Sequence, residues 1–292
     1  MQGLVELEND RLSLRVSTSG GAVVAGQTSD GRPFLRRHGD GAFDVLRSAC
    51  FPLVPLGNRV DQNRFELGGK NYRFKPNTAE PNYIHGDGWL TEWTIEDASA
   101  THVRLAFEQA RSANSPHIYG AVQTIFLDGA SVAMVLSVTN RGDETLPFGI
   151  GFHPYFPRTE GTRLMAPAAT WWTEREGCLP GVRTTIPGSA DFATPRRLPR
   201  RRLNNCFEGW SGQARIIWPE IKLAADISAN PLFSRYMLYA PEDEGSFFCL
   251  EPMSHTPNAL AMSFPEALHL LSPGETLSGA FSITVSDCEE FQ

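Results

Sequence analysis

The sequence predicts an all-β protein, a large antiparallel β-sandwich, on three observations. Apolar residues alternate with polar or small ones in many short stretches, turn-forming dipeptides separate these stretches, and no amphipathic helical stretch lies between them. Antiparallel strands need only tight connections, whereas a parallel sheet would need crossover helices. Because the 26 glycines and 21 prolines are scattered rather than gathered into a linker, we expect a single domain over residues 1–292.

Individual strands and turns follow in chain order. Alternation is plainest around residues 12–16, 103–107, 134–138 and 281–285, and each stretch is expected to bury one face. Asp128-Gly129, between AVQTIFL and SVAMVLSVTN, is the clearest hairpin signal. Further turns are indicated by Gly20-Gly21, Asp30-Gly31, Gly68-Gly69, Arg141-Gly142 and Pro273-Gly274.

Charge and cysteine content exclude several classes of protein. With 26 basic and 33 acidic residues the formal net charge is -7, so we expect neither a nucleic-acid nor a membrane partner. The start of the chain lacks the features of a signal peptide, and no apolar run is long enough to cross a membrane. The five cysteines are far apart and never spaced as CxxC, which predicts reduced thiols and a cytoplasmic location. The sequence does not indicate an oligomeric state.

Motifs for common cofactors are missing. The chain has no GxGxxG after a strand, no GxxxxGK[ST], no HExxH and no GxSxG, so we expect no cofactor and no metal. His85 and Asp87 have the HxD spacing of metal ligands, but nothing nearby in the sequence completes a set.

Two stretches place polar residues in apolar surroundings near the start. Asn58 and Arg59 follow a proline-broken apolar run, and a buried guanidinium needs acceptors, either from a ligand or from a structural ion pair. His85 lies beside glycines and near Trp89 and Trp93, a combination that suits the stacking and hydrogen bonding of a sugar. A buried histidine satisfied within the core is the alternative.

The stretch GIGFHPYFP, residues 149 to 157, raises the question of why space is cleared around a histidine. Gly149, Gly151, His153 and Tyr155 would share one face of an extended chain, and Pro154 puts His153 at a strand end or edge. We expect the two glycines to let a sugar ring lie beside His153. A bulge or close backbone packing is the alternative explanation of the glycines.

A second candidate for chemistry is Glu251, which ends the apolar run Phe247 to Leu250 in SFFCLEPMSH. Phe247, Cys249 and Glu251 would share a face, and Pro252 is expected to stop regular pairing there. A partly desolvated carboxylate is a stronger base than a free surface glutamate. Pairing of Glu251 with a nearby arginine is the alternative.

Together and in order, these motifs resemble the aldose 1-epimerase (galactose mutarotase) family over about residues 50 to 275. The similarity is greatest to the bacterial YphB-like branch, which shares NCFEGW and EPMSHTPNA. The motifs that carry the resemblance are Asn58-Arg59-Val60, His85-Gly86, His153-Pro154-Tyr155-Phe156, Leu203-Asn204-Asn205-Cys206-Phe207 and Leu250-Glu251-Pro252.

The resemblance implies a galactose mutarotase-like supersandwich that converts the α and β anomers of a free aldohexose, a small monosaccharide substrate, by opening and reclosing the ring. It implies that His153 is the general acid and Glu251 the general base, with Arg59 and His85 holding sugar hydroxyls or the ring oxygen. Asn58 belongs to the same set of substrate-binding residues. Asn204 stands where the family usually has an aspartate that binds a sugar hydroxyl, which puts the preferred sugar in doubt.

This chemistry suits a histidine with a pKa of roughly 6 to 7 on one side of the sugar and a carboxylate on the other. Glycoside hydrolysis generally needs two carboxyl groups instead. Two other functions remain open. The arginine run in residues 194 to 203 would suit a hexose-6-phosphate 1-epimerase, and the Asn204 departure would suit a non-catalytic carbohydrate-binding protein on the same fold.

Overall fold

The expected strands form two large antiparallel sheets in a computed structural model that describes residues 3–39, 41–242, 246–262 and 268–288. Over these residues the regular elements are β-strands and three-residue 3-10 helices, and the strand pairings are antiparallel. The prediction of an all-β fold is therefore confirmed. In the described part of the chain, no helix is long and apolar enough to cross a membrane.

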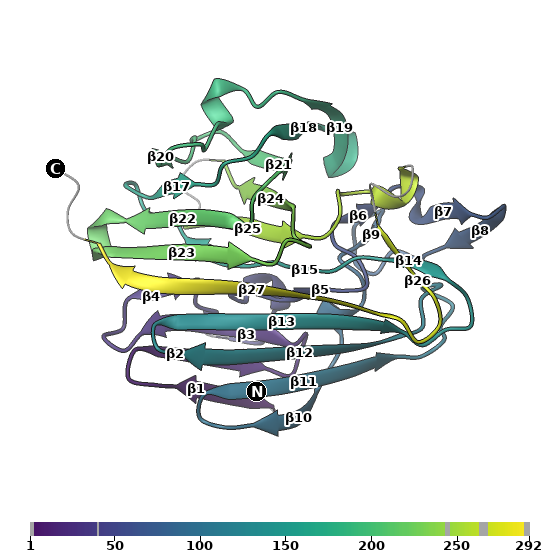
Figure 1. Cartoon of the computed structure of the whole chain (residues 1–292), viewed down its shortest axis with the longest axis horizontal. Helices are drawn as coiled ribbons and strands as arrows, with labels where there is room; N and C mark the ends of the chain where they lie inside the picture. The colour runs from purple at the N-terminus through teal and green to yellow at the C-terminus, as the bar shows by residue number, and fades with distance from the viewer. Residues whose placement is uncertain (1–2, 40, 243–245, 263–267, 289–292) are drawn as a thin grey trace.

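The larger sheet has nine strands and crosses the whole molecule, with the C-terminal strand β27 between β13 and β23 (Figure 1). In spatial order its strands are β10 (Thr94–Ala98), β11 (His102–Gln109), β12 (Tyr119–Asp128), β13 (Ser131–Asn140), β27 (Thr276–Asp287), β23 (Leu223–Ala229), β22 (Gln213–Trp218), β17 (Arg163–Met165) and β20 (Arg196–Arg197).

The second sheet carries most of the residues of interest. Its strands are, in order, β19 (Leu179–Thr184), β18 (Thr170–Arg175), β21 (Leu203–Glu208), β24 (Arg235–Ala240), β25 (Phe247–Met253), β15 (Gly151–Phe152) and β5 (Pro52–Leu53), with β16 (Tyr155–Pro157) also paired to β25.

Smaller sheets complete the fold. One has four strands, β1 (Leu4–Glu8), β2 (Leu12–Ser17), β3 (Ala22–Thr28) and β4 (Pro33–Leu35). Three have two strands each: β6 (Arg59–Val60) with β9 (Tyr83–Ile84), β7 (Arg64–Leu67) with β8 (Lys70–Arg73), and β14 (Leu146–Phe148) with β26 (His269–Leu271). The 3-10 helices are η1 (Val45–Arg47), η2 (Asp61–Asn63), η3 (Gly88–Leu90), η4 (Glu176–Cys178), η5 (Gly188–Ala190), η6 (Pro219–Ile221) and η7 (Ala259–Ala261).

The four stretches with the plainest alternation are β2, β11, β13 and β27, and their apolar residues are buried as expected. The predicted hairpin is also present. Asp128 pairs with Ser131, and Gly129 between them has a positive φ of 53°, which glycine adopts without strain.

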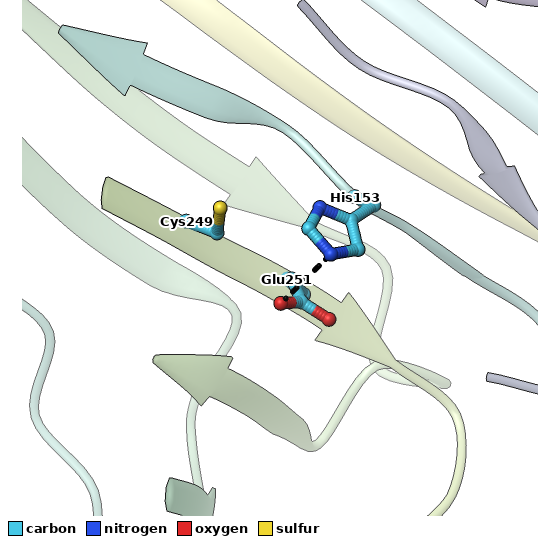
Figure 2. A group of neighbouring side chains, drawn as sticks. All are labelled: His153, Cys249 and Glu251. Carbon is cyan, nitrogen blue, oxygen red and sulfur yellow. Dashed lines mark ion pairs between the residues drawn. The ribbon is translucent and has the colours of Figure 1, made fainter. Parts of the chain in front are cut away.

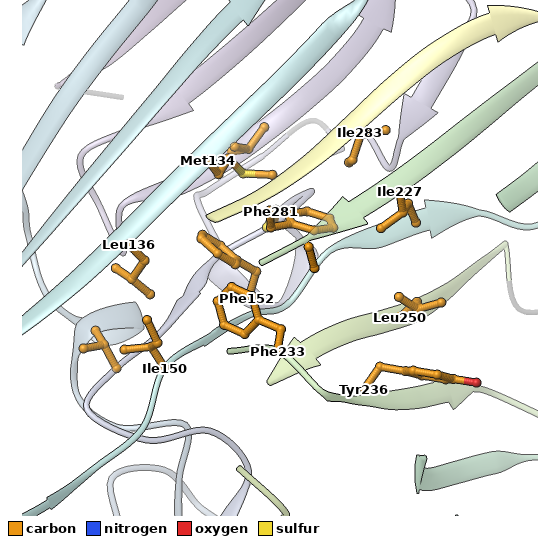
Figure 3. Close-up of a cluster of buried hydrophobic side chains, with 14 of the residues drawn as sticks. Met134, Leu136, Ile150, Phe152, Ile227, Phe233, Tyr236, Leu250, Phe281 and Ile283 are labelled. Carbon is orange, nitrogen blue, oxygen red and sulfur yellow. The ribbon is translucent and has the colours of Figure 1, made fainter. Parts of the chain in front are cut away.

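The hydrophobic core lies between the two large sheets (Figure 3). Phe152 of β15 stacks on Phe281 of β27, with ring centroids 5.5 Å apart, and Leu250 of β25 is buried in the same cluster. Burying a side chain of this size contributes about 1.5–3 kcal/mol. Because neighbouring side chains in an extended chain point to opposite faces, His153 and Glu251 face away from this core. The packing of the sandwich thus presents both on the outer face of the second sheet.

Candidate active site

A cavity of about 520 Å³ opens on this outer face of the second sheet. Its size falls in the range of small-ligand sites, roughly 300–1,000 Å³. All six residues predicted from the sequence line it: Asn58, Arg59, His85, His153, Asn204 and Glu251. The other lining residues are Leu46, Thr78, Ala79, Glu80, Ile84, Trp89, Tyr155, Cys178, Arg202 and Tyr239.

His153 and Glu251 form a buried pair at this cavity (Figure 2). Nε2 of His153 lies 3.3 Å from Oε1 of Glu251, and the two residues are only 7% and 3% exposed. The sequence predicted an acid and a base on opposite sides of the sugar, which stays a prediction, and the structure adds that the two groups lie next to each other. The short loop between β15 and β16 carries His153 directly over β25, so the two groups are adjacent.

The imidazole of His153 is fixed in a column of planar groups. Its ring lies between Phe51 and Tyr155, at centroid distances of 4.6 Å from each, and the interplanar angles of 25° and 23° are those of stacked rings. The guanidinium of Arg36 covers the far face of this column, 3.6 Å from the centroid of Tyr155. The backbone N–H of His153 donates to the carbonyl of Phe51 at 2.9 Å. These contacts leave the ring little freedom to rotate.

Burial sets the protonation of the pair. It lowers the pKa of His153 to about 3, and the positive charges of Arg36 and Arg59 act in the same direction. Burial also raises the pKa of Glu251 to about 8, against the opposing charge of Arg59. At a pH between these two pKa values, the pair holds one proton, which lies on the carboxyl group, and the imidazole is neutral. The expected histidine pKa of roughly 6 to 7 is therefore wrong, because the ring is desolvated.

Asn58 and His85 stand together in strained backbone. Both have left-handed φ angles, 59° and 60°, which non-glycine residues adopt at a cost and which cluster at functional sites. The backbone N–H of Asn58 donates to Nδ1 of His85 at 3.1 Å, and the N–H of His85 donates to the carbonyl of Asn58 at 2.9 Å. With Nδ1 accepting, and with burial lowering the pKa of His85 well below its usual value, Nε2 carries the proton as a neutral donor. His85 therefore has a hydrogen to offer a ligand.

The two arginines that line the cavity are each paired with a carboxylate. Arg59 donates to Glu80 through Nε at 2.7 Å and through its terminal nitrogen at 2.8 Å. Arg202 donates to Glu174 at 3.0 Å, and the amide of Asn204 donates to the same carboxylate at 2.6 Å. Arg59 lines the cavity and forms an ion pair with Glu80, so the structural ion pair is confirmed and binding of a ligand by Arg59 stays a prediction.

The two glycines of GIGFHPYFP do not clear space for a ligand, contrary to our expectation. A Cβ on Gly149 would overlap the ring of His255, lying 2.6 Å from its Nε2, and a Cβ on Gly151 would lie 2.6 Å from the carbonyl oxygen of Pro252. Neither glycine lines the cavity. The glycines permit close packing, because another histidine and the neighbouring strand occupy the space that side chains would fill.

One expectation for β25 is wrong and one is confirmed. Pro252 does not stop the pairing, because Glu251 and Met253 on either side of it stay paired with β24. Among the described residues Glu251 makes no ion pair with an arginine. The expected common face is confirmed, since Phe247 and Cys249 belong to a cluster on the cavity side and Leu250 to the core.

Of the other residues that the sequence analysis considered, some line the cavity and others lie outside it. Trp89 lines the cavity, whereas Trp93 is buried elsewhere and donates through Nε1 to the carbonyl of Gly88 at 2.8 Å. Asp87 joins no cluster of metal-ligating side chains in the described part of the chain. Of the five arginines in the arginine run, only Arg202 is among the described residues that line the cavity. Arg201 instead donates to Ser189 at 2.9 Å.

Sequence reasoning missed the carboxylates that hold the arginines, Glu80 and Glu174, and the lining residues Tyr239 and Cys178. Glu80 follows an ordinary polar loop and carries no signal. Glu174 comes two residues after Trp172 within β18 and likewise carries no distinctive signal.

Fold and site agree with one known family. The sequence model of that family, described as aldose 1-epimerase, matches residues 3–284, so the chain belongs to the aldose 1-epimerase family. It is 39% identical over 287 residues to the Escherichia coli K12 protein named "Uncharacterized protein YphB", covering 96% of this chain and 97% of that protein.

Solved structures support the same fold. A crystal structure from Escherichia coli K12 at 39% identity has a TM-score of 0.92, with 97% of this chain and 99% of that chain covered. A galactose mutarotase-like protein from Clostridium acetobutylicum has a TM-score of 0.86 at 18% identity, covering 97% and 95% of the two chains. The expected galactose mutarotase-like architecture is therefore confirmed.

Proposed function

We propose that this protein is an aldose 1-epimerase that interconverts the anomers of a free aldohexose, with His153 and Glu251 as the catalytic pair. The observation that carries the proposal is the buried pair itself, with 3.3 Å between Nε2 and Oε1 and one proton held between two groups of opposed pKa shift. Paired titratable groups whose environments push their pKa values apart are typical of acid–base sites.

The adjacency of the pair suits the reaction. Ring opening takes a proton from the anomeric hydroxyl and gives one to the ring oxygen, and both oxygens are bonded to the same carbon. An acid and a base that stand side by side can therefore reach both oxygens. One group loses a proton and the other gains one, so the pair still holds a single proton after opening, and reclosure on the other carbonyl face reverses both transfers. His153 and Glu251 each serve as acid in one direction and as base in the other.

The family resemblance assigns the first acid to His153 and the first base to Glu251. The raised pKa of Glu251 favours the opposite starting state, with the proton on the carboxyl group. A sugar that brings hydroxyl groups into the cavity supplies polar partners to the carboxylate and lowers the cost of its charge. We propose that the pair enters catalysis from either state, because one shared proton satisfies both.

The remaining lining residues are proposed to hold the sugar. His85 offers its Nε2–H, and Asn58 and Arg59 border the same side of the cavity. Asn204 uses its amide nitrogen on Glu174, which leaves its Oδ1 free to accept from a hydroxyl. Trp89 supplies an aromatic face of the kind on which sugar C–H groups stack.

Charge balance favours an uncharged sugar over a sugar phosphate. Each arginine that lines the described cavity is neutralised by its own carboxylate, Arg59 by Glu80 and Arg202 by Glu174. A phosphate would have to compete with an ion pair already made at short distance. We therefore do not favour the hexose-6-phosphate alternative, which predicts faster mutarotation of glucose 6-phosphate than of glucose.

Burial of the pair argues against a non-catalytic binding protein. A carboxyl group whose pKa is raised to about 8 costs the fold free energy at neutral pH, and sugar binding alone needs no such group. This cost is explained if the pair performs proton transfer.

The proposal is tested by polarimetry of freshly dissolved α-glucose and α-galactose. We expect Glu251→Gln and His153→Ala each to lower turnover by about 10²- to 10⁴-fold, the contribution of a positioned proton transfer. Glu144→Gln, an exposed carboxylate remote from the cavity lining, is the matched control and should keep full activity. Wild-type turnover in Glu251→Gln would overturn the assignment, and sugar binding by calorimetry without any rate enhancement in the wild type would favour the binding protein.

A further inference from the structure

A third side chain stands beside the catalytic pair. Cys249 lies two residues before Glu251 on β25, and alternate residues of a strand share a face. Figure 2 shows its thiol on the side of the strand that faces His153. One ligand atom from each of His153, Cys249 and Glu251 lies within 4.8 Å of the others, and all three residues are buried.

The three donors are the set that zinc uses in proteins, an imidazole nitrogen, a thiolate and a carboxylate. Tetrahedral zinc, with bonds of about 2.0–2.3 Å, places its donors roughly 3–4 Å apart. The distance of 3.3 Å between Nε2 of His153 and Oε1 of Glu251 already fits. The thiol of Cys249 lies within 4.8 Å of both ligand atoms and would move closer to coordinate the same ion.

A second observation points to a ligand at this position. The other carboxylate oxygen of Glu251, Oε2, is buried and has no hydrogen-bond partner within the described part of the chain. A buried acceptor without a partner is costly, and a cation bound by both oxygens of the carboxylate would satisfy it. The cavity in front of His153 and Glu251 supplies an entry path and room for a fourth ligand, either water or a sugar hydroxyl.

We propose that His153, Cys249 and Glu251 form a site for a thiophilic divalent cation of the zinc class, and that its occupation switches the enzyme off. The cation takes the lone pair of Nε2 and replaces the protons of the thiol and of the carboxyl group, which leave to solvent. These are the same atoms that exchange protons with the sugar, so metal binding and catalysis exclude one another. The inhibitory effect, though not the site, rests on the proposed function.

Charge supports the burial of such an ion. One thiolate and one carboxylate neutralise a divalent cation, and a neutral group is tolerated in a desolvated site where a single charge is not. Without metal, burial raises the pKa of Cys249 well above its usual range, so the thiol stays protonated and unreactive. Among the groups that face Cys249, Glu251 and Cys50 also raise the pKa of its thiol, whereas Arg36 lowers it.

Metal binding is measured first, without any activity assay. The full chain is treated with a chelator and dialysed against Zn²⁺, and we expect the wild type to take up one equivalent. Cys249→Ser and Cys249→Ala should bind more than about tenfold more weakly, since each removes a ligand. With Co²⁺ as the probe, the thiolate-to-cobalt absorption band should appear in the wild type and be lost in both variants.

Two other cysteines provide matched controls. Cys206 is similarly buried on β21, which β24 separates from β25, and Cys178 lines the cavity, but neither belongs to the cluster. Cys206→Ser and Cys178→Ser should therefore bind Zn²⁺ as the wild type does. Circular dichroism verifies that each variant folds, and the alanine variant of Cys249 serves if the serine variant does not.

Inhibition is measured next, by polarimetry with Zn²⁺ and with Mg²⁺. Zn²⁺ should abolish mutarotation by the wild type reversibly, with recovery on addition of EDTA, and Cys249→Ser should need more than about tenfold higher Zn²⁺. Mg²⁺, which prefers oxygen ligands, should have no effect. Equal Zn²⁺ affinity in the Cys249 variants, or relief of inhibition by Cys178→Ser, would overturn the site. A wild type that binds Zn²⁺ but never mutarotates a sugar would leave the site standing and remove the proposed function.

Discussion

Replacing Glu251 by glutamine should stabilise the protein at neutral pH while it removes the activity. The carboxyl group has a pKa of 4.5 in the unfolded chain and of about 8 in the fold, because burial favours its neutral form. The stability that the protonated group contributes is therefore complete below pH 4.5 and is lost as the pH rises to about 8. Glutamine has nearly the same shape and never ionises, so it avoids this loss.

The magnitude follows from the two pKa values. Between pH 4.5 and about 8, each pH unit withdraws about 1.4 kcal/mol from the wild type. We therefore expect Glu251→Gln to match the wild type near pH 4.5 and to exceed it by about 3 kcal/mol at pH 7. Urea denaturation of both proteins at pH 5, 6, 7 and 8 measures the difference directly.

Glu208 is the matched control. It is also a buried glutamate, on β21, but its carboxylate accepts from Arg235 at 3.0 Å and from Thr256 at 2.5 Å, and these partners hold its pKa below the usual value despite the burial. Glu208→Gln should destabilise the protein by about 3 kcal/mol, because it removes a buried carboxylate that Arg235 and Thr256 stabilise. A Glu251→Gln protein that is less stable than the wild type at pH 7, or a difference that does not change from pH 5 to pH 8, would refute the reasoning.

Three further outcomes are expected. The rate of mutarotation, after subtraction of the uncatalysed rate, should be flat through neutral pH and fall about tenfold per pH unit above pH 8, where the catalytic pair loses its shared proton; a profile that keeps rising to pH 10 would contradict this. Gly149→Ala should lower stability by about 1–3 kcal/mol through overlap with His255, whereas Gly188→Ala, with open space at its Cβ, should stay within about 0.5 kcal/mol in the same denaturation assay. Asn204→Asp places a second carboxylate against Glu174 and should raise the KM for the sugar by about tenfold, with recovery in the Asn204→Asp, Glu174→Gln double variant; an unchanged KM would show that the amide contact is dispensable.

Much of the fold and of the site membership could be predicted from the sequence. Alternation located β2, β11, β13 and β27 because a strand that is half buried must repeat every second residue. The same rule placed Glu251 and Cys249 on one face, opposite Leu250. The ordered motifs predicted that one site contains six residues, and all six line one cavity: Asn58, Arg59, His85, His153, Asn204 and Glu251.

The arrangement within that cavity was decided by tertiary structure. The glycines of GIGFHPYFP suggest room beside a histidine of the same stretch. Only the tertiary structure reveals that Gly149 makes room for His255, whereas His153 is stacked between Phe51 and Tyr155. Likewise, no local pattern indicates that Glu80 and Glu174 neutralise the cavity arginines.

The sequence by itself determined which residue types the site contains, because strand periodicity and motif order are properties of the chain. The distance between His153 and Glu251 and the protonation of the pair are properties of the folded sandwich. Desolvation and neighbouring charge set both pKa values, and each depends on segments that lie far apart in the chain. The sequence therefore identifies His153 and Glu251 as candidates, and their burial in the folded sandwich makes them a pair that shares one proton.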